Sequence, residues 1–486
     1  MKSESLAAAV LSTLTVLPLV GQEGSAPRRL EVDGQIVEHL LKFARKARAN
    51  RQFSRAREVW QMVLDHYDSD CAAARKGLGF RKVKGEWLRG KASSRADYDD
   101  RRMRLKTEKA WRDVVGLVGE LHGNYGLELV ASGDVAAGHY QLERALVFQP
   151  DEARWHRGLG HEEIDGFFGS GAQIAFVRRM REIRDKADEL REQSFPITEL
   201  DASRLPPTLR RTGIAFKGAR SKHFTHWIAG AQSEANDSVQ WAERCYELLS
   251  FLLGRERRAV RADAIRWNAF LQDNVQRDIL FASSPESTGR RTADQARMFA
   301  GTTFKVDGYW ASVTWGRHDS REDRIVAHVA RKHLLWGRNT GLSEGLMHVC
   351  QYLICGTTLT YYASLPHTVS SDYQFMRREP GVWQARIEEE IAQGKDWPLD
   401  RLARERSDNF RDSARVKAWS FMGWLVARYP DRWWRLITVM GPTKELTPET
   451  AAQRYREALG VDMHALQAEW REWARAGSPW RETSGF

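Results

Sequence analysis

The chain has 486 residues, a formal net charge of +11 and 19 tryptophans, and 42% of its residues are hydrophobic. This length can hold two or three domains, and the apolar and aromatic content excludes an intrinsically disordered protein. Basic runs such as RRMRLK at 101–106 are interpreted as solvated helix faces, because aromatic residues do not interleave with them. The net positive charge makes an anionic polymer of the cell envelope a possible partner, while no nucleic-acid partner is expected.

Residues 1–26 predict a secretory signal peptide. Lys2 precedes the apolar stretch LAAAVLSTLTVLPLVG, and small residues near its end offer a cleavage site. A retained N-terminal anchor is the alternative, although the stretch is shorter than the ~20 residues that span a bilayer. No later segment is long and apolar enough to cross a membrane, so we expect no span after cleavage. The expected location is secreted, or periplasmic within the cell envelope.

Two stretches, about 37–87 in the first repeat segment (27–90) and about 125–168 in the second (121–195), look like copies of one helical unit. The tripeptide Gly-Leu-Gly at 77–79 recurs at 158–160, and Gly85 corresponds to Gly166. Each copy predicts a helix pair, a turn, a short third helix and a brief extended tail. The pattern resembles tetratricopeptide-type repeats, in which stacked helix pairs form a groove that can take a peptide. The copies could equally serve only as a packing platform.

The remaining segments divide the chain further. Residues 91–120 predict a charged helical linker, and a second linker helix closes the repeat segment at 174–193. Two prolines and a basic stretch mark 196–220 as a linker into the last domain, 221–486. There, alternating patterns predict strands around 223–229 and 264–273 and paired strands at 302–317, followed mainly by helices. The predicted class is mainly α, with N-terminal repeats and a C-terminal α+β domain containing a small mixed sheet.

Four cysteines, at positions 71, 245, 350 and 355, are too few for a disulfide scaffold. A bridge between Cys350 and Cys355 and buried free thiols are both open alternatives.

Residues 324–353 predict two helices around a Gly/Asn turn, and they carry four candidate ligands: His328, His333, Glu344 and His348. In an H-E-x-x-H helix, two histidines at i and i+4 face one zinc ion, and the intervening Glu takes a proton from the metal-bound water. Here His328 fits the first position. His333 comes one residue late, which turns it roughly 100° from the required direction.

The positions between these histidines depart from that motif. Val329 stands at the general-base position and Lys332 at the second-histidine position. Valine cannot accept a proton, and a lysine ammonium has no lone pair for a metal. Glu344, in LSEGL on the following helix, is a good candidate for a third ligand.

With its E-G-L helix, this stretch resembles the peptidase-MA-like (gluzincin) domain of secreted bacterial proteins, over about 221–473. SKHFTHWIAGA near the start and VKAWSFMGWLVARYPDRWWRLI near the end are also typical of that family. The resemblance implies a zincin fold, with His328 and Glu344 in ligand positions. Val329 and Lys332 make the motif degenerate, so we expect a pseudoenzyme without a cofactor.

The predicted function is therefore peptide or protein binding, or scaffolding, by a secreted non-catalytic gluzincin-like protein. We expect His328 and Glu344 to persist as a buried hydrogen-bonded pair, with Lys332 neutralising the carboxylate. The alternative is a divergent zinc-dependent metallohydrolase that uses His328, Glu344 and His348. Glu344 and His348 lie at i and i+4 and so share one helix face. A loop over the cleft is expected at 356–380.

Overall fold

A computed structural model describes residues 26–90, 95–254, 265–283, 301–306, 308–315, 321–331, 341–356, 380–404, 412–440 and 446–475. The chain divides into two compact units, Met1–Ile174 and Ala175–Phe486. Residues 1–25 of the expected signal peptide and residues 357–379 of the expected loop lie outside the described residues. Within them, no helix combines the length and the hydrophobicity that crossing a bilayer requires. All four cysteines are free thiols, three of them buried.

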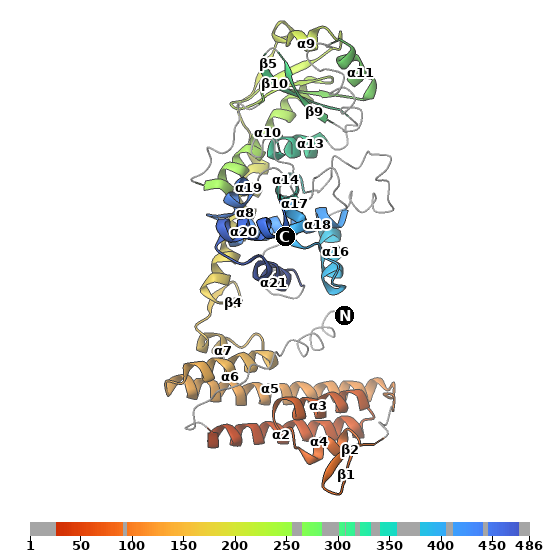
Figure 1. The fold of residues 1–486 in the computed structure, drawn as a ribbon, viewed down its shortest axis with the longest axis vertical. Coiled ribbons are helices and arrows are strands. Elements are labelled where there is room, and N and C mark those ends of the chain that lie inside the picture. Colours follow the sequence, from red (N-terminus) through yellow and green to blue (C-terminus); the bar gives the residue numbers. More distant parts are fainter. Residues whose placement is uncertain are drawn as a thin grey trace. The chain divides into compact units, whose positions relative to one another are not determined.

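Unit 1 contains the same series of elements twice: a long helix, a second helix, a six-residue helix and a β-hairpin (Figure 1). The first series is α2 (Ala26–Ala49), α3 (Phe53–His66), α4 (Ala72–Gly77), β1 (Phe80–Val83) and β2 (Glu86–Arg89). The second series is α5 (Arg101–Ala131), α6 (Val135–Phe148), α7 (Ala153–Gly158), β3 (Glu162–Ile164) and β4 (Phe167–Gly169). The predicted internal duplication is therefore visible in the element order.

Each short third helix is followed by an extended tail, as expected, and each tail folds back on itself as a β-hairpin. Lys84 and Gly85 have φ of 50° and 92°, and Asp165 and Gly166 have φ of 48° and 81°. Two consecutive positive φ values between antiparallel strands define a two-residue type I′ turn, which matches the twist of a hairpin. The same turn therefore closes both copies.

The second copy begins earlier than the sequence indicated. Asp100 caps α5 by accepting from the backbone N–H groups of Arg102 and Met103. The helix then runs without interruption to Ala131, so the boundary expected at 120/121 falls inside it. The expected charged linker is thus partly the first half of a repeat helix.

Unit 2 is built on a six-stranded mixed sheet of order β5-β6-β7-β8-β10-β9. Neighbours β7, β8 and β10 are parallel, and the other pairs are antiparallel. The strands are β5 (Thr198–Leu200), β6 (Lys217–Arg220), β7 (Thr225–Ile228), β8 (Trp267–Leu271), β9 (Gly301–Val306) and β10 (Tyr309–Trp315). The expected strands in the last domain are present. The segment 196–220, however, supplies two strands rather than a linker.

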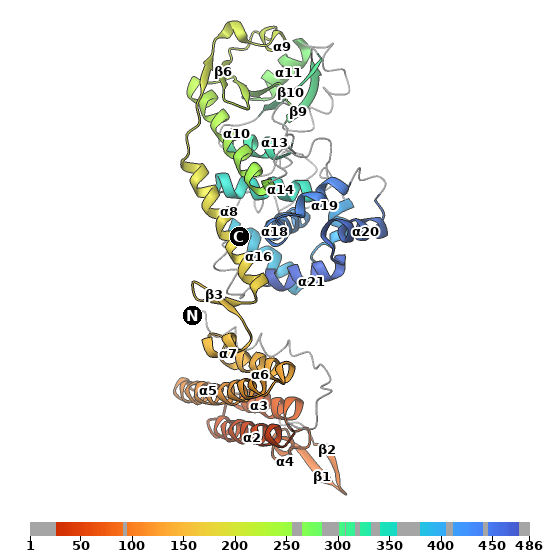
Figure 2. The ribbon, with the colours of Figure 1, turned by 90° about the vertical axis from the view of Figure 1, so that its left-hand side faces the viewer.

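The helices of unit 2 lie largely on one side of this sheet. They are α8 (Gly171–Glu192, which contains the unit boundary), α9 (Pro207–Arg210), α10 (Gln232–Leu253), α11 (Asn274–Ser283), α13 (Arg321–Val329), α14 (Gly341–Cys355), α16 (Pro380–Ala392), α17 (Leu399–Arg404), α18 (Asp412–Arg428), α19 (Trp433–Val439), α20 (Pro448–Leu459) and α21 (Met463–Ala474), with a 3-10 turn at Ala202–Arg204. Moving away from the sheet, α10 and α13 come first, then α14, then α18 (Figures 1 and 2). The mainly helical class with a small mixed sheet is thereby confirmed.

Candidate functional site

The candidate site lies on α13 and α14. His328 and Val329 end α13, and both are buried. The His328 ring faces the sheet, with its Nδ1 3.3 Å from the Ser312 hydroxyl of β10. Val329 is fully enclosed. The position expected for the general base therefore holds an aliphatic side chain in an apolar setting, where no proton can be accepted.

Helix α14 is buried almost all round, as its sequence GLSEGLMHVCQYLIC predicts for an interior helix. Gly345 lets α14 approach α18 closely, because a Cβ at this position would overlap the backbone carbonyl of Ala418. Glu344 and His348 are carried into the interior by this packing, and they are 2% and 0% exposed. Their Oε1 and Nε2 atoms lie 4.0 Å apart.

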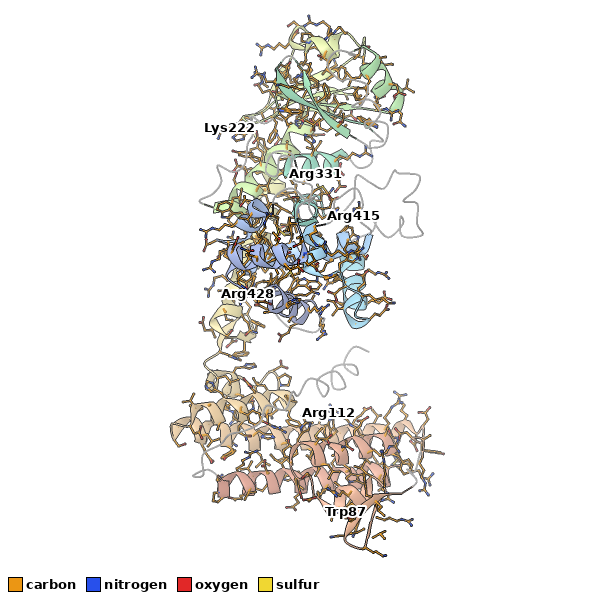
Figure 3. All side chains as sticks on the ribbon, viewed as in Figure 1. Trp87, Arg112, Lys222, Arg331, Arg415 and Arg428 are labelled. Carbon is orange, nitrogen blue, oxygen red and sulfur yellow. The ribbon has the colours of Figure 1, made fainter. Side chains whose placement is uncertain are left out.

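Two arginines from different segments flank Glu344. Nη2 of Arg331, just beyond α13, is 3.9 Å from Glu344 Oε2, and Nε of Arg415, on α18, is 3.7 Å from Oε1. Figure 3 labels both arginines. The Arg415 side chain is 5% exposed. A buried carboxylate thus has a guanidinium near each oxygen, where the expectation was neutralisation by Lys332. Lys332 and His333 lie outside the described residues.

His348 is a neutral imidazole whose tautomer follows from its neighbours. The amide of Gln351 donates to the Asp323 carbonyl, so its oxygen accepts from His348 Nδ1–H at 2.8 Å. Burial lowers the pKa of His348 to about 4, and the two arginines act in the same direction, while Glu344 opposes them. Nε2 therefore carries a lone pair. Neither it nor Glu344 Oε1 has a hydrogen-bond partner among the described residues.

The predicted metal set is not gathered around one point. In the described part of the chain, a single group of three such side chains brings a ligand atom from each within 4.8 Å of the others, and it is His223, Glu243 and Glu247. His328, Glu344 and His348 do not meet this spacing. Glu344 and His348 alone could contact one ion, and two protein ligands seldom hold zinc.

Sequence reasoning missed Arg331, Arg415 and the His223 group. Arg415 left a signal, because RVKAWSFMGWLVAR places Arg415 and Lys417 in an otherwise apolar helix. Such cations are rarely buried unless they are paired. The spacing of Glu243 and Glu247 was also informative, since residues at i and i+4 lie on one helix face.

No protein-family model, curated protein or solved structure matches this chain.

Proposed function

We propose that this protein is a non-catalytic relative of gluzincin peptidases that binds peptide or protein ligands, or acts as a scaffold, in the cell envelope or outside the cell. The observation that carries the proposal is the environment of Glu344. In an active gluzincin the glutamate at this position is a zinc ligand. Here guanidinium groups of Arg331 and Arg415 lie beside both carboxylate oxygens.

Electrostatics supports a site without zinc. A divalent ion about 4 Å from a guanidinium would be repelled by about 8 kcal/mol at an effective dielectric constant of about 20. Two arginines double this repulsion to about 16 kcal/mol, which roughly cancels the attraction of the Glu344 carboxylate for an ion at bonding distance, and a neutral His348 adds no charge that restores it. Val329 adds an independent argument, because a retained metal would still lack the base that activates its water. The residues present therefore do not fit a catalytic zinc centre.

The repeated helical unit supports a binding role. Helix pairs that stack in tandem form an extended surface for peptide ligands, and loss of chemistry in a neighbouring domain does not remove such a surface. The proposed ligand is a peptide or protein segment. The expected export would place the encounter in the envelope or outside the cell.

An anionic envelope polymer is the second candidate partner, favoured by one face of α5. Four cations there line a shallow hollow around Leu105, and none forms an ion pair with a described residue; they are Arg101, Arg102, Lys106 and Lys109. Replacing all four with Gln should abolish salt-sensitive retention on an anionic polysaccharide matrix. Retention equal to that of the wild type would rule out this face.

The metallohydrolase alternative rests on the two acceptor atoms of Glu344 and His348. The deciding experiment measures zinc content and peptide hydrolysis for the full chain, purified without added metal, alongside Glu344→Gln. We expect no zinc that depends on Glu344 and no hydrolysis. Stoichiometric zinc and hydrolysis, both lost in Glu344→Gln, would overturn the non-catalytic proposal.

A further inference from the structure

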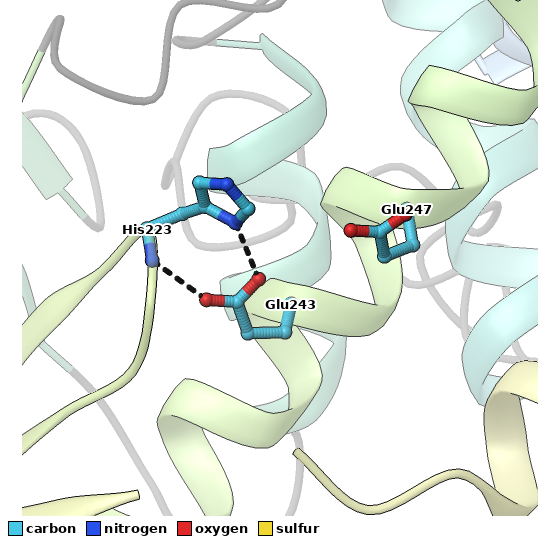
Figure 4. Close-up of side chains that lie close together, drawn as sticks. All are labelled: His223, Glu243 and Glu247. Carbon is cyan, nitrogen blue, oxygen red and sulfur yellow. Dashed lines mark hydrogen bonds and ion pairs between the residues drawn. The ribbon is translucent and has the colours of Figure 1, made fainter. Parts of the chain in front are cut away.

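A second cluster of ligand-type side chains lies at the junction of the sheet and α10. His223 sits in the turn between β6 and β7, while Glu243 and Glu247 occupy successive turns of α10 (Figure 4). One ligand atom from each lies within 4.8 Å of the other two. The cluster uses none of the residues around Glu344.

Local structure fixes two of these side chains before any ligand binds. Glu243 is 1% exposed and accepts from the backbone N–H of His223 at 2.8 Å. Its other oxygen lies 2.7 Å from His223 Nδ1. The Tyr246 ring stacks on the imidazole, with the centroids 4.0 Å apart. A histidine held by a carboxylate and an aromatic ring has little rotamer freedom left to lose on binding.

The charge of the cluster is unbalanced. Two of the three ligand-type groups are carboxyls, and the buried one, Glu243, pairs with the single imidazole of His223. Glu247 lies beside it, and within the described residues neither carboxylate has a lysine or arginine within 4.0 Å. Two carboxyl groups therefore share this cluster with one imidazole and with no lysine or arginine of the described residues. Like charges held this close repel each other, and a cation would relieve the repulsion.

We propose that His223, Glu243 and Glu247 bind a divalent metal ion of the zinc class. One imidazole nitrogen and two carboxylate oxygens suit zinc better than magnesium or calcium, which prefer all-oxygen sites. The ion would replace the proton between His223 and Glu243 and add Glu247 as a third ligand. Because the ligands come from the turn that connects β6 and β7 and from α10, the metal would tie this turn to the helix that covers it.

The site is tested by titrating zinc into the chelator-treated full chain. Calorimetry measures the binding, and thermal unfolding measures its effect on stability. Glu247→Gln is the informative variant, because Glu247 is half-buried and makes no contact on which the turn depends. Asp237→Asn, an exposed position on the same helix, is the matched control. We expect one zinc per chain, a higher melting temperature with zinc, and binding at least about tenfold weaker in Glu247→Gln but unchanged in Asp237→Asn.

His223→Asn provides a second variant with the same expected loss. Absence of zinc binding by the wild type, or binding unchanged in Glu247→Gln and His223→Asn, would overturn the inference. This result would leave the proposed non-catalytic function intact. Zinc lost in Glu344→Gln but retained in Glu247→Gln would overturn the site proposed here, and peptide hydrolysis lost together with that zinc would overturn the non-catalytic proposal as well.

Discussion

The Glu344→Gln substitution tests the central arrangement directly, because it removes the charge and keeps the size of the side chain. Glu344 is 2% exposed, and guanidinium nitrogens of Arg331 and Arg415 lie 3.9 and 3.7 Å from its oxygens. At an effective dielectric constant of about 20, each pair contributes about 4 kcal/mol of Coulomb attraction before desolvation is counted. Breaking a buried pair from one side costs about 3–5 kcal/mol, because the remaining charge stays desolvated. We expect Glu344→Gln to lower the free energy of unfolding of unit 2 by about this amount.

Denaturant unfolding of the full chain, followed by tryptophan fluorescence, measures this change with and without a chelator. Arg415→Met and the double variant complete a mutant cycle. If the carboxylate and guanidinium are coupled, the double variant loses less stability than the sum of the single variants. The reasoning would be refuted by a change in the free energy of unfolding below about 1 kcal/mol, or by additive effects of the two substitutions. It would also be refuted if the chelator destabilised the wild type and Glu344→Gln abolished that effect.

Three further outcomes follow from the packing. Gly345→Ala should destabilise unit 2 by about 1–3 kcal/mol in denaturant unfolding, because its Cβ overlaps the Ala418 carbonyl; an unchanged midpoint would contradict the close approach of α14 and α18. Burial lowers the pKa of Lys417 to about 7 despite Asp396, 3.1 Å away, so the unfolded state binds more protons between about pH 7 and 10. The free energy of unfolding should therefore rise through this group by up to about 1.4 kcal/mol per pH unit. Denaturant unfolding of the wild type and of Lys417→Met from pH 7 to about 9 measures this rise, which the variant should lack. Equal dependence of the free energy of unfolding on pH in the two proteins would contradict the prediction. Gly166→Ala should cost about 1 kcal/mol by thermal unfolding, since φ is 81° there, and no loss would mean that the turn relaxes.

Most elements followed from local patterns, and the differences arise where long-range pairing decides the structure. Alternation predicted the strand around His226 and the paired strands at 302–317. The segment 196–220 looked like a linker because Pro206 and Pro207 and several basic residues interrupt its pattern. Both strands are only three or four residues long, and β5 is the edge strand of the sheet, so the segment needs few apolar residues. The hairpins were seen only as extended tails, although Asp165-Gly166 is a favourable turn pair.

The candidate site was predicted in part. Burial of His328 and Glu344 was predicted and is confirmed, and the lack of a carboxylate at the general-base position follows from Val329. The two arginine neighbours could not be derived from spacing, because Arg415 reaches Glu344 only through the packing of α18 on α14. Periodicity shows which face of a helix is buried, but it does not identify the side chain that meets it from another helix.

The two strands within 196–220 have a practical consequence for shortened forms of the protein. Cutting the chain at Ser221, where the pattern suggested that the last domain begins, would remove β5 and β6 and make β7 an edge strand. The hydrogen-bonding groups that β7 now shares with β6 would be exposed beside the apolar side chains of Trp227 and Ile228. An unprotected edge of this kind recruits strands from other molecules. Such a fragment should aggregate, whereas one that retains residues from Ala175 onward keeps the edge covered.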